Sequence, residues 1–142
     1  MKKIYALLFC CCAITFSACA QNKQSTEKQT PKKTTKMDTN KLTNQDVKKA
    51  FNAWQNGDAK LWLSFFTDDA KLFDDGNPRD FKRFVSDACG NEKFTTIDKV
   101  ENNGTAIFGN FHTKSWGDFK TYFKFTPDGK GKFSKLEIGQ AN

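Results

Sequence analysis

Few side chains in this 142-residue chain have the chemistry of a metal or nucleophilic site. His112 is the only histidine, and three of the five cysteines, at positions 10 to 12, lie inside an apolar N-terminal run. A zinc site needs several imidazole or thiolate ligands. The residue types therefore predict no metal site and no cofactor. The remaining candidates for functional residues are carboxylates and aromatic side chains.

The remaining two cysteines have different predicted roles. Cys19 follows the apolar run in the stretch Phe16-Ser17-Ala18-Cys19, which resembles the lipobox of bacterial lipoproteins. We therefore predict that residues 1–18 are a lipoprotein signal peptide and that Cys19 carries the lipid. Cys89 is then the only free thiol and cannot form an internal disulfide. We interpret it as a small apolar helical residue rather than a nucleophile.

The N-terminal run has a second interpretation. It is shorter than the roughly 20 apolar residues of a membrane-spanning helix, so we expect it to be removed. Ala18-Cys19-Ala20 also fits the small-x-small rule of ordinary signal peptidase, and cleavage before Gln21 would give a soluble secreted or periplasmic protein. The preferred prediction is a lipid anchor in the bacterial envelope, facing the periplasm or the exterior.

Residues 19–41 are predicted to be a disordered basic tether. They carry six lysines against Glu27 and Asp38 and have no aromatic residue, so they bury too little apolar surface to fold. From Leu42 onward, fifteen basic and fourteen acidic residues nearly cancel. A nearly neutral domain lacks the basic surface that a phosphate backbone requires, which excludes nucleic acid as a partner.

The spacing of apolar residues predicts one domain over residues 42–142, with its helices first. Thr43 is predicted to cap the first helix, and Asp58 caps a second helix directly after Gly57. The apolar positions of these two helices are Val47, Ala50, Phe51 and Trp54, then Leu61, Trp62, Phe65 and Phe66. A short strand over 70–73 and a third helix from Asn77 to Gly90 follow.

From Phe94 onward the apolar period changes to two. Strands are predicted near 94–101, 105–114, 119–126 and 132–139, separated by turn residues. Helices followed by an antiparallel meander indicate an α+β fold, in which N-terminal helices pack against a curved, mostly antiparallel C-terminal sheet.

Hairpin geometry predicts the strand register. A two-residue Asn103-Gly104 turn pairs Val100 with Ile107 and Thr96 with Phe111. A three-residue loop at 116–118 then pairs Phe111 with Phe123 and gathers the phenylalanines on one face. In this register the His112 side chain lies on the wetter face of the sheet. A loop of two or four residues would place it on the opposite face.

The stretch "FNAWQNGDAKLWLSFFTDDAKLFDDG", residues 51–76, with the ending "GKFSKLEIGQA", resembles the nuclear transport factor 2-like superfamily over residues 43–141. This group includes SnoaL-like polyketide cyclases and ketosteroid isomerase. The resemblance implies a cone-shaped sheet around a long helix, with a small apolar ligand in its open end and frequent dimers through the sheet. The pocket candidates are Trp54, Trp62, Phe65, Phe73, Phe111 and Phe123.

The resemblance also implies a catalytic position. In the isomerase pattern, the acidic residue at the end of the first strand is the general base, and it corresponds to Asp74. The pattern also needs a tyrosine seven residues before Gly57, where this chain has Ala50. Asp98, which the predicted register places on the phenylalanine face, is a weaker candidate for a partner acid. Its structural alternative is pairing with a lysine. Asp74 also has a structural interpretation, as a turn residue before Gly76.

The sequence therefore predicts an envelope lipoprotein whose cone domain binds a small apolar or amphiphilic molecule, without assigned catalysis. Two alternatives stay open. One is an acid–base enzyme of SnoaL-like type with Asp74 as base. The other is a protein-interaction module that uses the convex sheet face around Ile97, Phe108 and Tyr122.

Overall fold

The computed structural model describes residues 37–142; the predicted signal peptide, Cys19 and most of the predicted tether lie outside the described residues. The elements are η1 (Thr39–Lys41), α1 (Gln45–Gln55), α2 (Ala59–Ser64), β1 (Phe66–Asp74), β2 (Asn77–Arg79), α3 (Phe81–Ala88), β3 (Lys93–Phe94), β4 (Lys99–Glu101), β5 (Ala106–Thr113), β6 (Gly117–Pro127) and β7 (Phe133–Gln140). The Lys41 ammonium donates to the Ile97 carbonyl at 2.7 Å. The last residues assigned to the tether are therefore attached to the domain.

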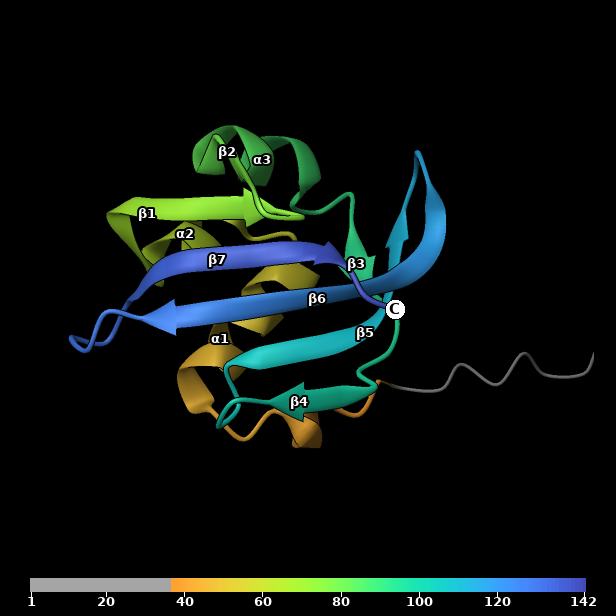
Figure 1. Cartoon of the computed structure of the whole chain (residues 1–142), viewed down its shortest axis with the longest axis horizontal. Helices are drawn as coiled ribbons and strands as arrows, with labels where there is room; N and C mark the ends of the chain where they lie inside the picture. The colour runs from red at the N-terminus through yellow and green to blue at the C-terminus, as the bar shows by residue number, and fades with distance from the viewer. Residues whose placement is uncertain (1–36) are drawn as a thin grey trace, which may run out of the picture. The chain divides into compact units, whose positions relative to one another are not determined.

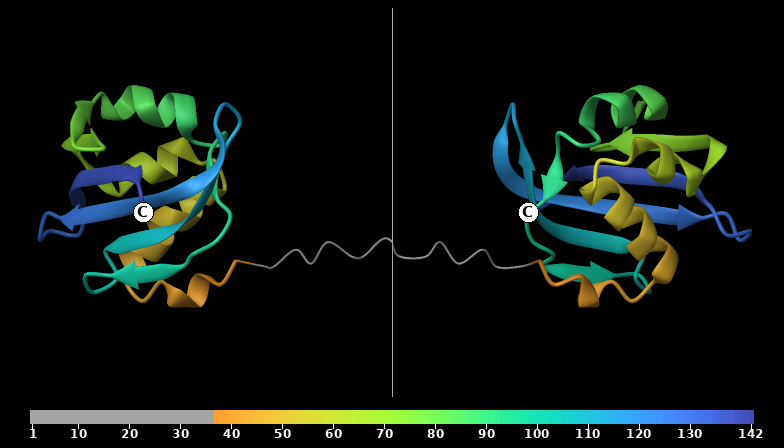
Figure 2. Two further views of the ribbon diagram at one scale, coloured as in Figure 1. Left: turned by 45° about the vertical axis from the view of Figure 1, so that its right-hand side comes forward. Right: turned by 180° about the vertical axis from the view of Figure 1, so that it is seen from behind.

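The seven strands of the described chain form one sheet in the order β2-β1-β7-β6-β5-β3, with β4 also paired to β5. β1 and β7 are parallel, and the other pairs are antiparallel. The sheet lies in front of α1 and α2 in Figure 1, and α1 crosses its inner face in Figure 2. The predicted α+β architecture, with helices against a curved and mostly antiparallel sheet, is confirmed.

Asn44, rather than Thr43, caps α1. Its side-chain oxygen accepts hydrogen bonds from the backbone N–H groups of Asp46 and Val47, both at 3.1 Å. Asp58 caps α2 as predicted, because its carboxylate accepts from the Leu61 N–H at 2.9 Å. Gly57, between the two helices, has the positive φ of 73° that glycine adopts without strain.

The third helix begins later than predicted. Asp75 and Gly76 have φ values of 46° and 80°, which form a two-residue hairpin turn between β1 and β2. Asn77 is therefore the first residue of β2 and not a helix cap. Asp80 caps α3 instead, through a 2.9 Å bond from the Arg83 N–H.

The predicted strand over 94–101 is two strands, because the chain bulges between them. Val100 pairs with Ile107 as predicted, but Phe94, rather than Thr96, pairs with Phe111. The extra residues leave the ladder, and the Thr95 N–H bonds to the Asn110 carbonyl at 2.8 Å. A bulge of this kind bends a sheet.

The β5–β6 hairpin turns earlier than predicted. Thr113 pairs with Gly117, so the loop is residues 114–116 and Phe111 pairs with Phe119 instead of Phe123. The difference is an even number of positions, and an even shift preserves the face of every side chain. The phenylalanines therefore still gather on the inner face, as expected.

Aromatic rings fill the space between α1, α2 and the inner face of the sheet. The rings of Trp54 and Trp62 lie 4.9 Å apart, and the Trp54 ring lies 5.5 Å from that of Phe123. Both tryptophans are fully buried. The core is therefore filled at this level.

Candidate functional site

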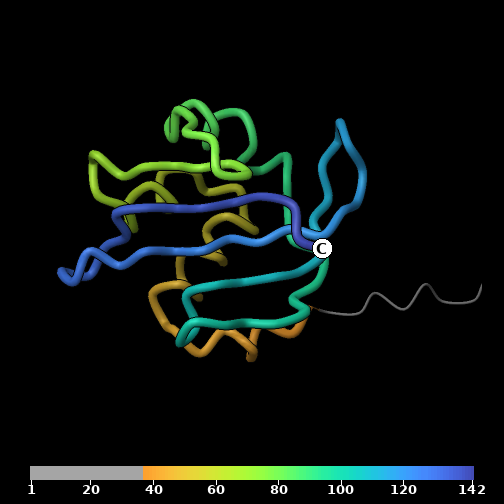
Figure 3. Tube along the Cα trace, in the orientation of Figure 1, coloured from red at the N-terminus to blue at the C-terminus, as the bar shows by residue number. Residues whose placement is uncertain are grey.

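A cavity of about 440 Å³ opens beside the ends of β1 and β7. Its walls come from β1, β2, α3, the turn after α3, and the strands β5 to β7. The β5–β6 hairpin rises to the level of α3 in Figure 3. The lining residues are Asp74, Asp75, Arg79, Phe84, Asp87, Ala88, Glu92, Phe111, Thr113, Ser115, Trp116, Phe119, Thr121, Phe123, Ile138, Gly139 and Gln140.

Asp74, Phe111 and Phe123, three of the residues proposed from the sequence, line this cavity. The other pocket candidates lie elsewhere. Trp54 and Trp62 are buried beneath it as core residues. Phe65 follows α2 and packs against the core, and Phe73 pairs with Pro78 and Glu137 on the outer face of the sheet. Aromatic content alone did not distinguish core rings from cavity walls.

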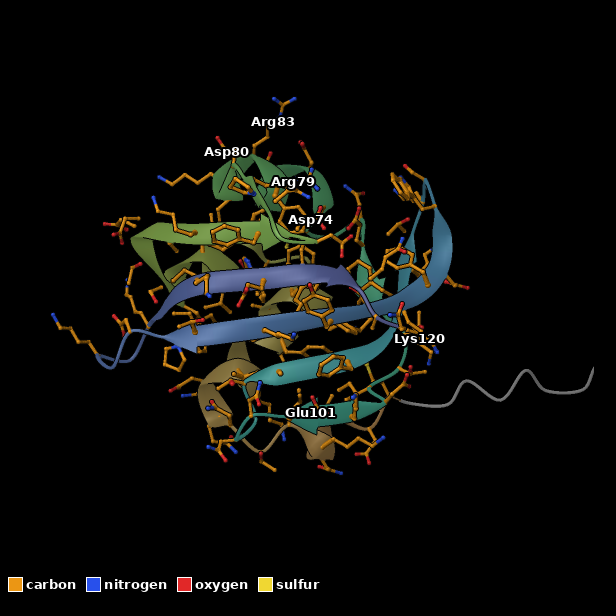
Figure 4. All side chains as sticks on the ribbon, viewed as in Figure 1. Asp74, Arg79, Asp80, Arg83, Glu101 and Lys120 are labelled. Carbon is orange, nitrogen blue, oxygen red and sulfur yellow. The ribbon has the colours of Figure 1, made fainter. Side chains whose placement is uncertain are left out.

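Asp74 reaches the cavity because it pairs with Ile138 on the inner side of the sheet. The Arg79 guanidinium lies 2.5 Å from its carboxylate and 5.6 Å from the centre of the Phe84 ring. Figure 4 shows Asp74 and Arg79 side by side at the end of β1. The Asp74 charge is therefore matched inside the cavity.

Glu92 is a site residue that the sequence interpretation did not identify. It follows the turn after α3, where its N–H donates to the Ala88 carbonyl at 2.9 Å. Burial raises the pKa of its carboxyl group, and the negative Asp74 acts in the same direction, while Arg79 opposes them. Among residues 37–142 its side chain forms no ion pair, in contrast with Asp74.

Asp75 and Asp87 also border the cavity, but their carboxylates have other partners. The Asp75 carboxylate accepts from the Gln140 N–H at 2.9 Å and lies beside Gly139. Asp87 is exposed, with the Arg83 guanidinium at 3.8 Å. Glu92 is thus the carboxylate at this cavity whose charge is least matched.

The placement of Asp98 on the phenylalanine face is wrong. The bulge before β4 turns Asp98 outward, where it pairs with Lys120 and accepts from the Thr96 hydroxyl at 2.9 Å. These hydrogen bonds lower the pKa of the Asp98 carboxyl group. The lysine pairing considered as its structural alternative is the arrangement observed, and Asp98 does not line the cavity.

His112 and Cys89 take no part in the cavity lining. His112 is on the wetter face, as predicted, and its Nδ1 lies 2.7 Å from the Asp118 carboxylate. Burial and the negative Asp58 raise the pKa of the Cys89 thiol, which disfavours the thiolate that a nucleophile needs. Among residues 37–142, no three His, Cys, Asp or Glu side chains are grouped to hold a metal ion.

The outer face of the sheet carries a small aromatic and basic surface. The Phe108 and Tyr122 rings lie 6.0 Å apart, with the Lys99 ammonium 4.4 Å from the first and that of Lys124 4.4 Å from the second. Ile97 was predicted to contribute to this surface. It does not, because it is buried in the core. No helix within residues 37–142 has the length and apolar character to span a membrane.

Comparison with known proteins relates the chain to others by structure. No family model matches the sequence, and no curated protein does either. An NTF2-like protein of unknown function from Cytophaga hutchinsonii aligns over 75% of this chain and 93% of its own, at 12% identity and a TM-score of 0.57. This chain has the nuclear transport factor 2-like fold.

Two further structures show the range of proteins with the nuclear transport factor 2-like fold. The orange carotenoid protein of Anabaena, which binds canthaxanthin, aligns over 68% of this chain and 35% of its own, at 18% identity and a TM-score of 0.56. A candidate SnoaL-like polyketide cyclase from Shewanella putrefaciens aligns over 66% of this chain and 76% of its own, at 18% identity and a TM-score of 0.51. At these identities the likeness establishes the fold alone.

Proposed function

We propose that this domain binds a small apolar or amphiphilic molecule in the cavity beside β1 and β7, without assigned catalysis. The cavity carries the proposal: its volume of about 440 Å³ falls within the range of roughly 300–1,000 Å³ that is common for ligand pockets. Phe84, Phe111, Phe119 and Phe123 line it. Similar folds occur in a canthaxanthin-binding protein and in candidate polyketide cyclases, which is in keeping with such a role.

The proposal extends to where the protein acts. Cys19, after an apolar run and before a lysine-rich segment, is proposed to carry a lipid that holds the domain at a bacterial envelope membrane. An apolar ligand has low solubility in water, and a binding domain near a membrane would meet it at its source.

Filling the cavity tests the binding proposal. Phe119 lines the cavity and is half-buried, so Phe119→Trp adds volume inside it. We expect the full-length chain, purified from its own host and measured by native mass spectrometry, to carry a small molecule that this variant loses. For any alkyl or aromatic probe that binds, we expect affinity to fall by about tenfold, or 1.4 kcal/mol.

Phe108→Trp is the matched control, since Phe108 lies on the outer face of the sheet. It should keep the bound molecule and the probe affinity. Wild-type protein that is empty in repeated preparations and binds no apolar probe would contradict the proposal.

An acid–base enzyme is the second candidate, and the position of Asp74 inside the cavity favours it. Among residues 37–142 the arrangement lacks the isomerase oxyanion donor, because Ala50 has no side-chain donor and Tyr122 pairs with Gly139 on the outer face. Such a donor supplies a few kcal/mol of transition-state stabilisation. Turnover of the co-purified molecule that is lost in Asp74→Asn, with binding retained, would establish this function.

A further inference from the structure

The charged residues of the cavity are gathered on one side, and this distribution bears on which ligand fits. Asp74 and Glu92 come from the end of β1 and the turn after α3, with Asp87 from α3 beside them. Phe111 and Phe119 come from β5 and β6, which β7 separates from β1 in the sheet. Phe84 and Ala88 of α3 are apolar residues near the carboxylates, so the cavity has one side with carboxylates among apolar residues and one side without carboxylates.

Within the described residues, the cavity lining holds a single cationic side chain, Arg79. It already lies 2.5 Å from the Asp74 carboxylate. Arg79 is therefore paired with Asp74, and although its charge also acts on Glu92, Glu92 is half-buried and forms no ion pair in the described chain. A carboxylate taken out of water without a cation is unfavourable, and a bound cation would offset part of this penalty.

The same arrangement disfavours an anionic ligand. A carboxylate or phosphate head placed at the side with carboxylates would face Glu92 and Asp87 at close range, and like charges brought together oppose binding. A neutral apolar molecule would meet no such repulsion, but it would leave Glu92 unpaired.

Trp116 adds a second group suited to a cation. It lines the cavity from the β5–β6 loop, and 78% of its surface is exposed. Its backbone N–H donates to the Thr113 hydroxyl at 2.9 Å, which holds the loop in place. The face of an indole ring attracts ammonium groups, so a cation at the mouth would find both a carboxylate and an aromatic ring.

We propose that the cavity selects a cationic amphiphile, a molecule with an apolar body against Phe111 and Phe119 and an amine or quaternary ammonium head beside Glu92. This inference rests on the proposed binding function and names the class of ligand. Glu92 is the main determinant of the preference, and Asp87 contributes less because it is exposed and has Arg83 nearby.

A series of ligands with one apolar body and different heads tests the inference. The full-length chain is titrated calorimetrically with dodecanol below its solubility limit, and with dodecylamine, dodecyltrimethylammonium and dodecanoate below their micelle concentrations. We expect the two cationic compounds to bind about tenfold more tightly than dodecanol, in keeping with one charge-assisted contact. Dodecanoate should bind most weakly, and the stoichiometry should be one per chain.

Glu92→Gln should remove most of the preference for the amine and leave dodecanol affinity unchanged. Glu101→Gln is the matched control, because Glu101 ends β4, pairs with Lys99 and lies far from Asp74 in Figure 4. It should keep the full preference.

The outcomes separate this inference from the binding function on which it rests. If dodecanol binds as well as the amines, or dodecanoate binds better, the cavity binds apolar molecules and the charge preference is wrong. An amine preference that survives Glu92→Gln would also overturn the proposal. If no member of the series binds, the binding function itself fails.

Discussion

Two carboxylates of one cavity, Asp74 and Glu92, have opposite surroundings. Asp74 has a guanidinium at 2.5 Å, whereas Glu92 is half-buried without an ion pair in the described chain. Because burial raises the pKa of Glu92, the folded state holds its proton more tightly than the unfolded state does. The charged form of Glu92 therefore lowers stability, while its neutral form does not.

This difference predicts how stability depends on pH. The neutral Glu92 contributes stability fully at pH values below 4.5, its ordinary pKa, and this contribution is lost as pH rises through the raised value. Glutamine does not ionise. The melting temperature of Glu92→Gln minus that of the wild type should therefore increase as pH rises from 4 to 7. Thermal melts at several pH values in a single ionic strength measure this.

Glu101→Gln controls for the loss of an exposed glutamate. The difference between its melting temperature and that of the wild type should not increase in the same way with pH. A Glu92→Gln difference that stays constant between pH 4 and 7 would show that burial of Glu92 does not affect its ionisation.

At the scale of elements, local sequence patterns predicted where the helices lie more accurately than they predicted the residue at which each helix begins. The stripe from Val47 to Trp54 and the Gly57-Asp58 break are where the sequence placed them, because apolar period and capping act within a few residues. The cap itself differed, since Thr43 and Asn44 are both good capping residues and only the approach of the preceding chain selects between them.

The cap of α1 can be tested by replacing each candidate. Asn44→Ala removes the acceptor for the N–H groups of Asp46 and Val47 and should lower the free energy of unfolding by about 1 kcal/mol. Thr43→Ala removes a hydroxyl that makes no cap bond in the described structure and should cost less. Urea denaturation of the two variants and the wild type compares them, and equal losses would contradict the assignment.

The strand register and the cavity could not be predicted from local sequence alone, because both depend on contacts between different elements. The bulge before β4 displaced Asp98 because Gly109 lets the Thr96 carbonyl approach the β5 backbone, where a Cβ atom would overlap it. Glu92 acquired its surroundings from β1 and β2, which are distant in sequence. Phe111 and Phe123 were identified because a period of two places them on the inner face in any register of even shift.

For the whole molecule, the proposed location depends on one residue outside the described part of the chain. Cys19 was assigned from its place after the apolar run, and the alternative is ordinary cleavage before Gln21. The two routes differ in whether the sulfur of Cys19 is retained and acylated.

Cell fractionation distinguishes the two routes. We expect the wild-type protein in the membrane fraction and Cys19→Ser in the soluble fraction or unprocessed, because serine cannot form the thioether to the lipid. The mass of the mature wild-type N-terminus should include the acyl chains. Soluble wild-type protein beginning at Gln21 would establish the other route.

The central place of β7 has a consequence for when this chain acquires its structure. β7 is the last strand in sequence, yet it lies between β1 and β6 and joins the two halves of the sheet. Until it has been synthesised, β1 and β2 have no partner across the gap, and the nascent chain cannot close its core. For a chain exported as proposed above, the sheet would therefore be completed only after β7 has been synthesised.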